Sequence, residues 1–364
     1  MRCHRHPTGR SFMNANDRPS APREKRPASL IDVANEARVS TGTVSRALSR
    51  PGMISTATRE RVLAAADRLG YVANGAARAL VMQRNRTVGA IVPRFGTSSF
   101  STMIQSLEAT LAANGYTLLL SAPEHGRVPE ATLLRTLIER GVDAVALLGG
   151  EHDDDTRMML ERHRLPAVMM WCQRAGRREC IGFDEPQAGT LLIDHLAALG
   201  HRTFGFIGGH LAGNERAQLR FAGVRGAIAR QELRLHEAAI VETDYGFAQG
   251  FDAMQLILAR RLPVSAIICG NDYLAVGALS ALNQAGIAVP DALSIVSFND
   301  NDFAAYAHPP LTTVRLPICA IGESAGRYLI AQLDGLPLPE EAPLPVQLMV
   351  RASSGPAPGT DPSR

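Results

Sequence analysis

A run of short hydroxyl side chains and one arginine lies between residues 40 and 46, where the chain reads STGTVSR. Hydroxyl and guanidinium groups hydrogen-bond phosphate oxygens, and arginine also binds a guanine edge through two parallel hydrogen bonds. Residues 1–86 contain 16 Lys and Arg against 6 Asp and Glu, whereas the rest of the chain contains 22 against 29. This asymmetry favours a polyanionic partner for the basic segment, and a solvated charged surface is the alternative.

A second set of polar and aromatic residues follows the apolar runs in the rest of the chain. The set contains Ser98, Phe100, Trp171, Asn214, Arg216, Arg220, Tyr245, Asn271, Asp272 and Asn299. Because the carboxyl ends of parallel strands meet at one edge of a sheet, these residues are expected to surround a common ligand. Amides and carboxylates bind vicinal hydroxyls while an aromatic ring covers the apolar face of a sugar, so Asn271, Asp272 and Trp171 suit a polyol.

Several of these residues also have a structural alternative. Arg216 can pair with Glu215 or face solvent, Asp272 can cap the helix that follows it, and Trp171 can belong to the core. Asp300 is expected to be structural rather than to bind a ligand.

Sequence motifs of enzymes are absent. There is no glycine-rich phosphate loop and no G-x-S-x-G motif. The five cysteines are dispersed and lack a Cys-x-x-Cys pair, which argues against both a disulfide framework and a zinc site. We therefore expect a protein that is not an enzyme and needs neither a metal nor a cofactor. With no 18-residue apolar run and no apolar secretion signal, the chain is expected in the cytoplasm.

Three short helices are predicted around the first run. Ser29 and Asp32 begin the first helix, and Ser40 caps the second, which stops at Pro51-Gly52. The third spans Thr56–Leu69. Apolar residues recur at helical spacing in the first helix at Ile31, Val33, Ala34 and Ala37, and those expected to face inward in the third are Val62, Leu63, Ala66 and Leu69. Three such helices in about 45 residues predict a helix-turn-helix module.

From residue 87 onward, apolar strand-like runs alternate with segments of helical period. The runs are Thr87–Pro93, Tyr116–Ser121, Asp143–Gly149, Pro166–Trp171, Thr203–Gly209, Ala266–Gly270 and Ser294–Phe298. The helical segments include Thr102–Asn114, Glu130–Arg140, Arg216–Gln231, Gly246–Arg260 and Leu274–Gly286. Continuous apolar runs are typical of buried parallel strands, so we predict an α/β fold with doubly wound parallel sheets in two lobes.

These patterns predict five segments. They are a disordered basic arm at 1–27, a helix-turn-helix headpiece at 28–73, a linker at 74–86, a two-lobed α/β domain at 87–351 and a disordered tail at 352–364 rich in Ser, Gly and Pro.

The segment SLIDVANEARVSTGTVSRALSRPGMISTATRERVLAAADRLGYVANGAARAL resembles the DNA-binding headpiece of the lactose-repressor (LacI-type) family. Downstream, LGHRTFGFIGG, RFAGVRGAI, GNDYLAVGAL, VPDALSIVSFND and PPLTTVRLP resemble landmarks of the same family. The resemblance covers residues 28–351. It implies a dimeric transcription repressor whose effector-binding domain, similar to periplasmic sugar-binding proteins, controls its binding to operator DNA.

The resemblance assigns roles within the headpiece and the linker. Thr41 and Gly42 lie where the family reads operator sequence, and Arg46 is expected to contact a base, with a phosphate contact as the alternative. Ser40, Thr43 and Ser45 are expected to cap the helix or contact phosphates. The segment 74–82 resembles the family's hinge helix, in which Asn74, Ala77 and Leu80 approach the minor groove, with Leu80 as the wedge that bends DNA.

In the large domain, Arg220 resembles the family's ligand-binding arginine. Two departures from the family pattern change the expected ligand, because Asn299 and Trp171 stand where many members have acidic residues. With Arg216 and Arg220 available, a sugar acid is favoured over a neutral sugar, since guanidinium binds carboxylate bidentately. The VSFND, PPLTTVRLP and Trp171 details also look like the gluconate-repressor branch.

The functional prediction is a cytoplasmic, homodimeric repressor of carbohydrate or sugar-acid catabolic genes, released from DNA by a small effector. A regulator that needs a bound corepressor is the alternative within this class. A sugar-binding transport protein would share the two-lobed fold, but it has no use for a DNA-binding headpiece.

Overall fold

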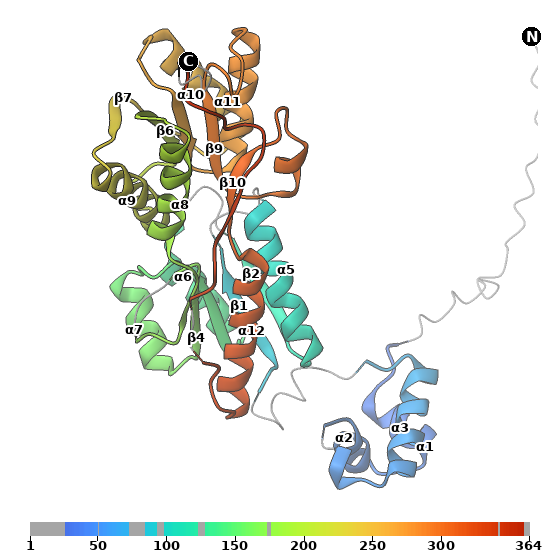
Figure 1. Ribbon diagram of the computed structural model, residues 1–364. Helices are drawn as coiled ribbons and strands as arrows, with labels where there is room; N and C mark the ends of the chain where they lie inside the picture. Colours follow the sequence, from blue (N-terminus) through green and yellow to red (C-terminus); the bar gives the residue numbers. More distant parts are fainter. Residues whose placement is uncertain are drawn as a thin grey trace, which may run out of the picture. The chain divides into compact units, whose positions relative to one another are not determined.

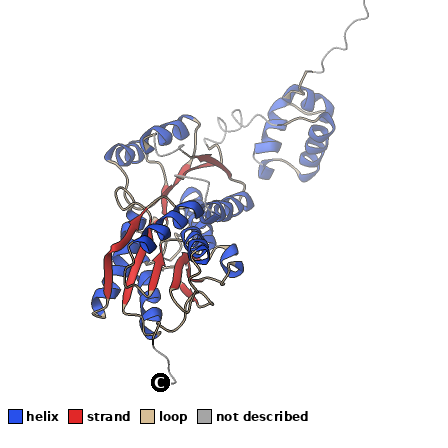
Figure 2. Cartoon of the chain, turned by 90° about the horizontal axis from the view of Figure 1, so that it is seen from above, coloured by secondary structure: helices blue, strands red, loops and turns tan. Residues whose placement is uncertain are grey.

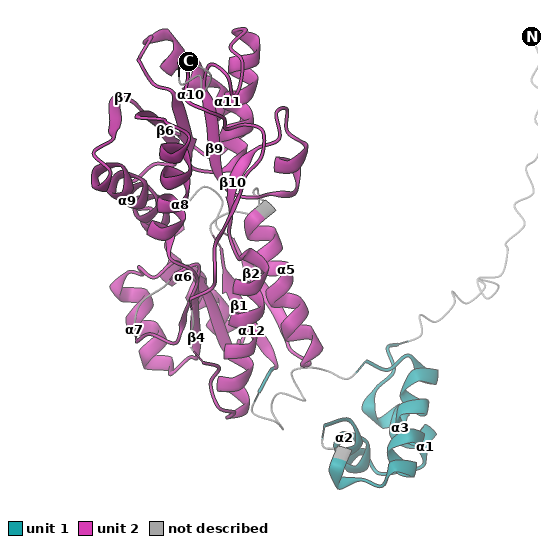
Figure 3. Ribbon diagram, in the orientation of Figure 1, with its two compact units in different colours: residues 1–85 teal, residues 86–364 magenta. Residues whose placement is uncertain are grey.

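The computed structural model describes residues 26–49, 51–72, 84–92, 98–122, 128–172, 176–340 and 343–359. The chain divides into two compact units, residues 1–85 and 86–364 (Figure 3). The predicted hinge residues Asn74, Ala77 and Leu80, and residues 1–25 of the predicted basic arm, lie outside the described residues.

The N-terminal unit contains the three predicted helices, α1 (Leu30–Ala37), α2 (Thr41–Ser49) and α3 (Thr56–Leu69), with a short 3₁₀ helix (Pro51–Met53) before α3. Ser29 and Asp32 form a reciprocal capping box at the start of α1, as predicted. Gly70 ends α3 in the left-handed conformation (φ 62°), which glycine adopts without strain. A small apolar cluster joins the helices and contains Val33, Ala34, Ala37, Val44, Ala47, Val62, Ala65 and Ala66.

The apolar pattern of this unit is only partly buried. Ile31, Leu63 and Leu69 are exposed by 61%, 38% and 37%, so the prediction that the two leucines face inward is wrong. Ala65 is buried in their place. The larger side chains that do pack against this cluster are Leu30, Leu48, Ile54 and Tyr71, and each is only partly buried.

The second unit consists of two lobes, each built on a parallel sheet covered by helices on both faces (Figures 1 and 2). The first lobe has strand order β2-β1-β3-β4-β5, and the second has β11-β10-β9-β8-β6-β7. The strands of the first lobe are β1 (Thr87–Ile91), β2 (Thr117–Ser121), β3 (Ala144–Leu148), β4 (Ala167–Met170) and β5 (Cys180–Ile181). Those of the second are β6 (Thr203–Gly208), β7 (Arg234–Glu242), β8 (Ala266–Cys269), β9 (Ser294–Asn299), β10 (Thr312–Arg315) and β11 (Gln347–Met349), of which β11 alone is antiparallel.

Helices α5, α6, α7 and α12 belong to the first lobe, and α8, α9, α10 and α11 to the second (Figure 1). Their bounds are α5 (Ser98–Ala113), α6 (Glu130–Glu139), α7 (Asp154–His163), α8 (Glu185–Ala198), α9 (Glu215–Arg230), α10 (Phe247–Ala259), α11 (Asp272–Gln284) and α12 (Ile318–Asp334). The chain therefore crosses between the lobes after β5, after β10 and after α12. Gly322 lets α12 approach α5, because a Cβ there would lie 2.2 Å from the carbonyl oxygen of Met103.

The predicted doubly wound fold is confirmed, and the predicted strands lie within one or two residues of those observed. The named runs did not include β5, β7, β10, β11, α7, α8 or α12. No helix in the described part of the chain is both long and apolar enough to span a membrane.

The C-terminal segment differs from its prediction as a disordered tail, because residues 352–359 pack against the second lobe. The Ser353 hydroxyl is fully buried, donates to the Ile295 carbonyl (2.6 Å) and accepts from the Thr312 amide (2.8 Å). The Ala357 amide donates to the carbonyl of Leu199 (2.8 Å). These hydrogen bonds satisfy buried backbone groups of β9 and β10, which composition alone does not reveal.

A chain truncated after Arg351 should therefore be less stable than one truncated after Gly359. Loss of Ser353 leaves the buried Thr312 amide and Ile295 carbonyl without partners, each worth roughly 1–3 kcal/mol. We expect a melting temperature several degrees lower by calorimetry for the shorter chain, and equal melting temperatures would contradict this role.

Candidate functional site

The outer face of α2 presents the first set of predicted residues to solvent. Thr41, Gly42 and Arg46 are exposed, whereas Thr43 and Ser45 are half-buried. Ser40 caps the helix as predicted, because its hydroxyl accepts a hydrogen bond from the Thr43 amide (3.1 Å). The cap fixes the first turn of the helix that carries the three exposed residues.

The guanidinium of Arg46 lies beside Gly42 in the first turn of the helix. A Cβ at Gly42 would lie 3.9 Å from both terminal nitrogens of Arg46, so the guanidinium lies beside the first turn, toward which long helical side chains lean. Arg46 has no ion-pair partner in the described part of the unit. Arg46 therefore presents an exposed guanidinium to an external hydrogen-bond acceptor.

In the second unit, an ion pair between Arg220 of α9 and Glu185 of α8 lies at the interface between the lobes. Nε and Nη2 of Arg220 donate to the two carboxylate oxygens of Glu185 (2.9 and 2.8 Å), and both side chains are almost fully buried. Nη1 of Arg220 donates to the Gly270 carbonyl (2.6 Å), and its guanidinium lies over the Phe298 ring. Burial disfavours the charged guanidinium, but the attraction of Glu185 outweighs it and raises the pKa of Arg220 above its usual value.

Trp171 reaches this ion pair from the first lobe. Its indole N–H donates to Glu185 Oε1 (2.8 Å), and its ring packs against Phe100 (5.5 Å between centroids) and Phe183 (5.9 Å). Trp171 follows β4 directly and has φ 62°, a left-handed conformation that turns its side chain back toward the other lobe. Glu185, which the sequence analysis missed, therefore binds residues of both lobes. Its position in the first turn of a helix that follows a strand could have identified it.

Arg216 lies one turn before Arg220 and faces a cleft of about 660 Å³ between the lobes. The residues lining the cleft include Ile91, Leu148, Gly149, His152, Asn214, Glu215 and Arg216. Arg216 lies over the Phe100 ring (5.8 Å) and has no ion-pair partner in the described part of the chain. Burial lowers its pKa below the usual value.

Glu215, the alternative partner of Arg216, binds backbone amides of the other lobe. Its Oε2 accepts hydrogen bonds from the backbone amides of Gly150 (2.7 Å) and Glu151 (3.2 Å) in the opposite lobe. These bonds hold the second lobe to the loop after β3. The alternative expectation, that Arg216 pairs with Glu215, is therefore not observed.

Three further predicted site residues differ in what they contact. They are Tyr245, Asn214 and Asn271. Tyr245 lies against Gly209, where a Cβ would be 2.5 Å from its hydroxyl oxygen, and burial raises the pKa of the phenol. Asn214 lines the cleft and also caps α9, accepting from the Ala217 amide (3.3 Å). Asn271 caps α11 and is almost fully buried.

Asn299 contributes a polar group with no partner. Its Nδ2 donates to the hydroxyl of Ser99 in the other lobe (3.1 Å), and that hydroxyl donates to Asn301 Oδ1 (3.1 Å). The Oδ1 of Asn299 is buried and accepts no hydrogen bond among the described residues. A ligand hydroxyl could satisfy it. Of the neighbouring Ser98, the structure describes only that it begins α5.

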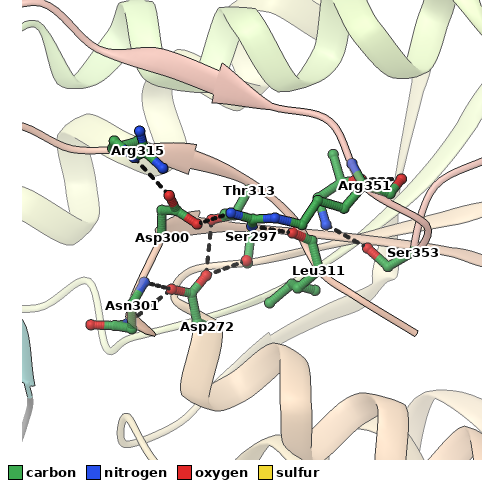
Figure 4. A network of polar contacts seen from close by, with 10 residues as sticks. Asp272, Ser297, Asp300, Asn301, Leu311, Thr313, Arg315, Arg351 and Ser353 are labelled. Atoms are coloured by element: carbon green, nitrogen blue, oxygen red, sulfur yellow. Dashed lines mark hydrogen bonds and ion pairs between the residues drawn. The ribbon is translucent and has the colours of Figure 1, made fainter. Parts of the chain in front are cut away.

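Asp272 has a structural role in place of the predicted effector contact (Figure 4). Its fully buried carboxylate accepts from the hydroxyls of Ser297 (2.5 Å) and Thr313 (2.9 Å), and from the backbone and side chain of Asn301 (2.6 and 2.9 Å). Because both of its oxygens accept hydrogen bonds and its side chain is fully buried, Asp272 holds the loop after β9 in place.

Asp300 in the same loop binds Arg315 and Arg351, both at 2.7 Å (Figure 4). This contact agrees with the structural role expected of Asp300. No group of three His, Cys, Asp or Glu side chains in the described ranges could hold a metal ion.

Comparisons with known proteins agree with the division of the chain into a helix-turn-helix unit and a two-lobed unit. Residues 29–74 match the family model of bacterial regulatory proteins of the lacI family, and residues 193–354 match that of a periplasmic binding protein-like domain. The chain is 34% identical over 320 residues to the HTH-type transcriptional repressor CytR of Escherichia coli, covering 86% of this chain and 92% of CytR. It is 32% identical over 308 residues to the ribose operon repressor of Escherichia coli, covering 84% and 93%.

Solved structures show the same relationship. The transcription regulator GntR from Chromobacterium violaceum matches with a TM-score of 0.70 and 34% identity, over 74% of this chain and 99% of that one. The lac repressor dimer bound to operator and the anti-inducer ONPF matches with a TM-score of 0.80 and 25% identity, over 91% and 100%.

A helix-turn-helix unit combined with a two-lobed ligand-binding unit defines the class of effector-controlled transcription regulators. The chain belongs to the lacI family of bacterial regulatory proteins and is a DNA-binding transcriptional repressor.

Asp272 makes the stability of the second unit depend on pH. Burial raises the pKa of Asp272 from 3.8 to about 6, so between these pH values the folded state binds its proton more tightly than the unfolded state. This group's contribution to stability is present below about pH 4 and is lost as the pH rises to about 6. The free energy of unfolding of Asp272→Asn relative to the parent should thus change by roughly 2–3 kcal/mol across this range. Urea unfolding measured across this pH range tests the prediction. Parallel curves of unfolding free energy against pH for the parent and Asp272→Asn would contradict a raised pKa of Asp272.

Proposed function

We propose that the protein is a cytoplasmic homodimeric repressor that leaves its operator when a sugar acid binds between the lobes of the second unit. Arg216 carries this proposal, because it places a partly desolvated guanidinium without an ion-pair partner in the cleft. A buried cation is stabilised by an anion, and a carboxylate binds guanidinium bidentately. The polar groups around it suit recognition of a ligand rather than catalysis.

A hydroxylated ligand also fits polar groups at the interface between the lobes that lie beyond the residues lining this cleft. The unsatisfied Oδ1 of Asn299 accepts a hydroxyl proton, and two of the five N–H groups of Arg220 remain available after its bonds to Glu185 and Gly270. Trp171 and Phe100 supply aromatic faces beside them. A polyol chain with one carboxylate satisfies all of these groups, whereas a neutral sugar leaves Arg216 without a counter-ion.

On the DNA side, we propose that α2 enters the major groove and that Arg46 contacts a base edge. Thr41 lies on the same exposed face, and Ser40, Thr43 and Ser45 support the helix or bind phosphates. We further propose that Asn74, Ala77 and Leu80 form a hinge at the minor groove, with Leu80 as the wedge. The solved lac repressor that this chain resembles is a dimer bound to operator.

The second lobe carries a partly exposed aromatic surface, in which Phe247 is 48% exposed and Tyr273 and Phe303 are half-buried. The rings of Phe247, Tyr273 and Phe303 lie within 5.7 Å of one another, and Tyr306 beside them is 88% exposed. Large exposed aromatic groups are enriched where proteins associate. We therefore place part of the subunit interface on this aromatic surface.

Replacing Tyr306 with Asp should weaken the dimer, because association would bury the introduced charge. Sedimentation equilibrium should shift from about twice the 39.0 kDa chain mass toward the monomer. Met158→Asp on α7, which is also exposed, is the control and should remain dimeric. A dimeric Tyr306→Asp protein would exclude this surface.

Arg46→Ala should weaken binding to the operator by about 1–3 kcal/mol and relax its sequence preference, as expected for loss of a guanine contact. Fluorescence anisotropy with operator and with scrambled DNA separates the two effects. The matched control is Arg59→Ala, an exposed arginine on α3. Equal weakening of binding to operator and to scrambled DNA would indicate that Arg46 contacts a phosphate and not a base.

The effector proposal is tested by screening sugars, phosphorylated sugars and sugar acids for thermal stabilisation and for operator release. A sugar acid should stabilise the protein and release DNA, and Arg216→Gln should reduce its affinity by tenfold or more without changing operator binding in its absence. Release by a neutral sugar that is insensitive to Arg216→Gln would refute the proposal. Strengthened operator binding would instead make the ligand a corepressor.

A further inference from the structure

Glu185 lies inside the proposed effector site, where it is surrounded by donors. Two nitrogens of Arg220 and the indole nitrogen of Trp171 donate to its carboxylate at 2.8–2.9 Å, and 4% of its side chain is exposed. The carboxylate is also in the first turn of α8, where the helix dipole favours negative charge. The protein itself thus supplies the anion that Arg220 would otherwise take from a ligand.

A ligand carboxylate has little prospect of displacing Glu185. Removal of Glu185 from Arg220 would leave a buried carboxylate without its counter-ion, which is strongly unfavourable. The guanidinium is held on its other side by the Gly270 carbonyl and by the Phe298 ring. The ion pair is therefore a fixed, neutral part of the site, able to bind hydroxyls through its remaining N–H groups.

The positive charge of the cleft consequently comes from Arg216. Arg216 has no ion-pair partner in the described residues, whereas the carboxylate of the adjacent Glu215 accepts from the backbone amides of Gly150 and Glu151. Both Arg220 and Glu185 are close enough to influence Arg216 electrostatically. The site thus offers one unpaired cation and, beside it, an arginine that is already neutralised.

We propose that Glu185 sets the charge selectivity of the effector site, restricting it to ligands with a single carboxylate. This inference rests on the proposed sugar-acid function. The carboxylate binds Arg216, and the hydroxyl chain extends toward Arg220 and Asn299. A second carboxylate at the far end of the ligand would find Arg220 already neutralised by Glu185 and would lose its hydration without gaining a counter-ion, so aldonates bind and aldarates do not.

Trp171 provides a direct measurement of binding at this site. It is the only tryptophan of the chain, and its indole N–H contacts Glu185 itself. Its fluorescence should be titrated with matched open-chain ligands of four, five and six carbons. Each series contains the neutral alditol, the aldonate with one carboxylate and the aldarate with two, so that only charge differs within a series.

The parent protein should bind the aldonate of the preferred length at least tenfold more tightly than the corresponding aldarate. Glu185→Gln retains the shape of the side chain but leaves Arg220 with an unpaired positive charge. The affinity for the aldarate should therefore rise at least tenfold relative to the affinity for the aldonate. The double variant Glu185→Gln with Arg220→Gln removes both charges and should restore the parental preference. Thermal melts of each variant establish that it is folded.

An unchanged aldonate-to-aldarate ratio in folded Glu185→Gln would overturn the role of Glu185 while leaving the sugar-acid function intact. If Glu185→Gln does not fold, the double variant still tests the role of Glu185. Loss of the preference for the aldonate over the aldarate in the double variant would contradict a charge-based mechanism. Alditols binding as tightly as aldonates to the parent protein, or no binding in any series, would refute the sugar-acid function and this inference with it.

Discussion

The buried ion pair between Arg220 and Glu185 is the interaction on which the proposed effector site depends. Both charges are removed from water, which is tolerated because the contact is bidentate and the remaining polar atoms have partners in Trp171 and Gly270. The pair holds α8 against α9 and receives Trp171 from the other lobe. Replacing Arg220 alone would leave Glu185 buried without its counter-ion, so such a variant would mix loss of stability with loss of ligand binding, whereas Arg216 can be changed without this effect.

The contacts between the lobes around the cleft are polar, which suits a domain that must change conformation. Glu215 bonds backbone amides of the first lobe, Ser99 bonds Asn299 and Asn301, and Trp171 bonds Glu185. Hydrogen bonds can exchange with water or with a ligand hydroxyl at small net free energy, whereas separation of a large apolar interface is strongly unfavourable. A ligand that engages these groups better in one arrangement of the lobes shifts the population toward that arrangement.

The two units use arginine in opposite ways. In the helix-turn-helix unit, Arg46 stays exposed beside Gly42, where it can meet an acceptor supplied by another molecule. In the second unit, Arg220 is satisfied internally and Arg216 remains available in the cleft. The carboxylates that the fold brings near each arginine therefore decide whether its guanidinium is paired within the protein, as in Arg220, or left without an ion-pair partner, as in Arg46 and Arg216.

Local patterns in the sequence were sufficient for the three helices of the first unit, the caps at Ser29 and Ser40, and most strands of the two lobes, because capping and apolar periodicity act between residues close in sequence. Tertiary structure alone decided the roles of Glu185, Asp272 and Ser353. Their partners lie 14–35, 25–41 and 41–58 residues away. An acidic side chain or a serine looks the same in a sequence whether it faces a ligand or a buried donor. The exposure of Leu63 and Leu69 has the same origin, since helical spacing predicts a face but the neighbouring helices determine how much of it is covered.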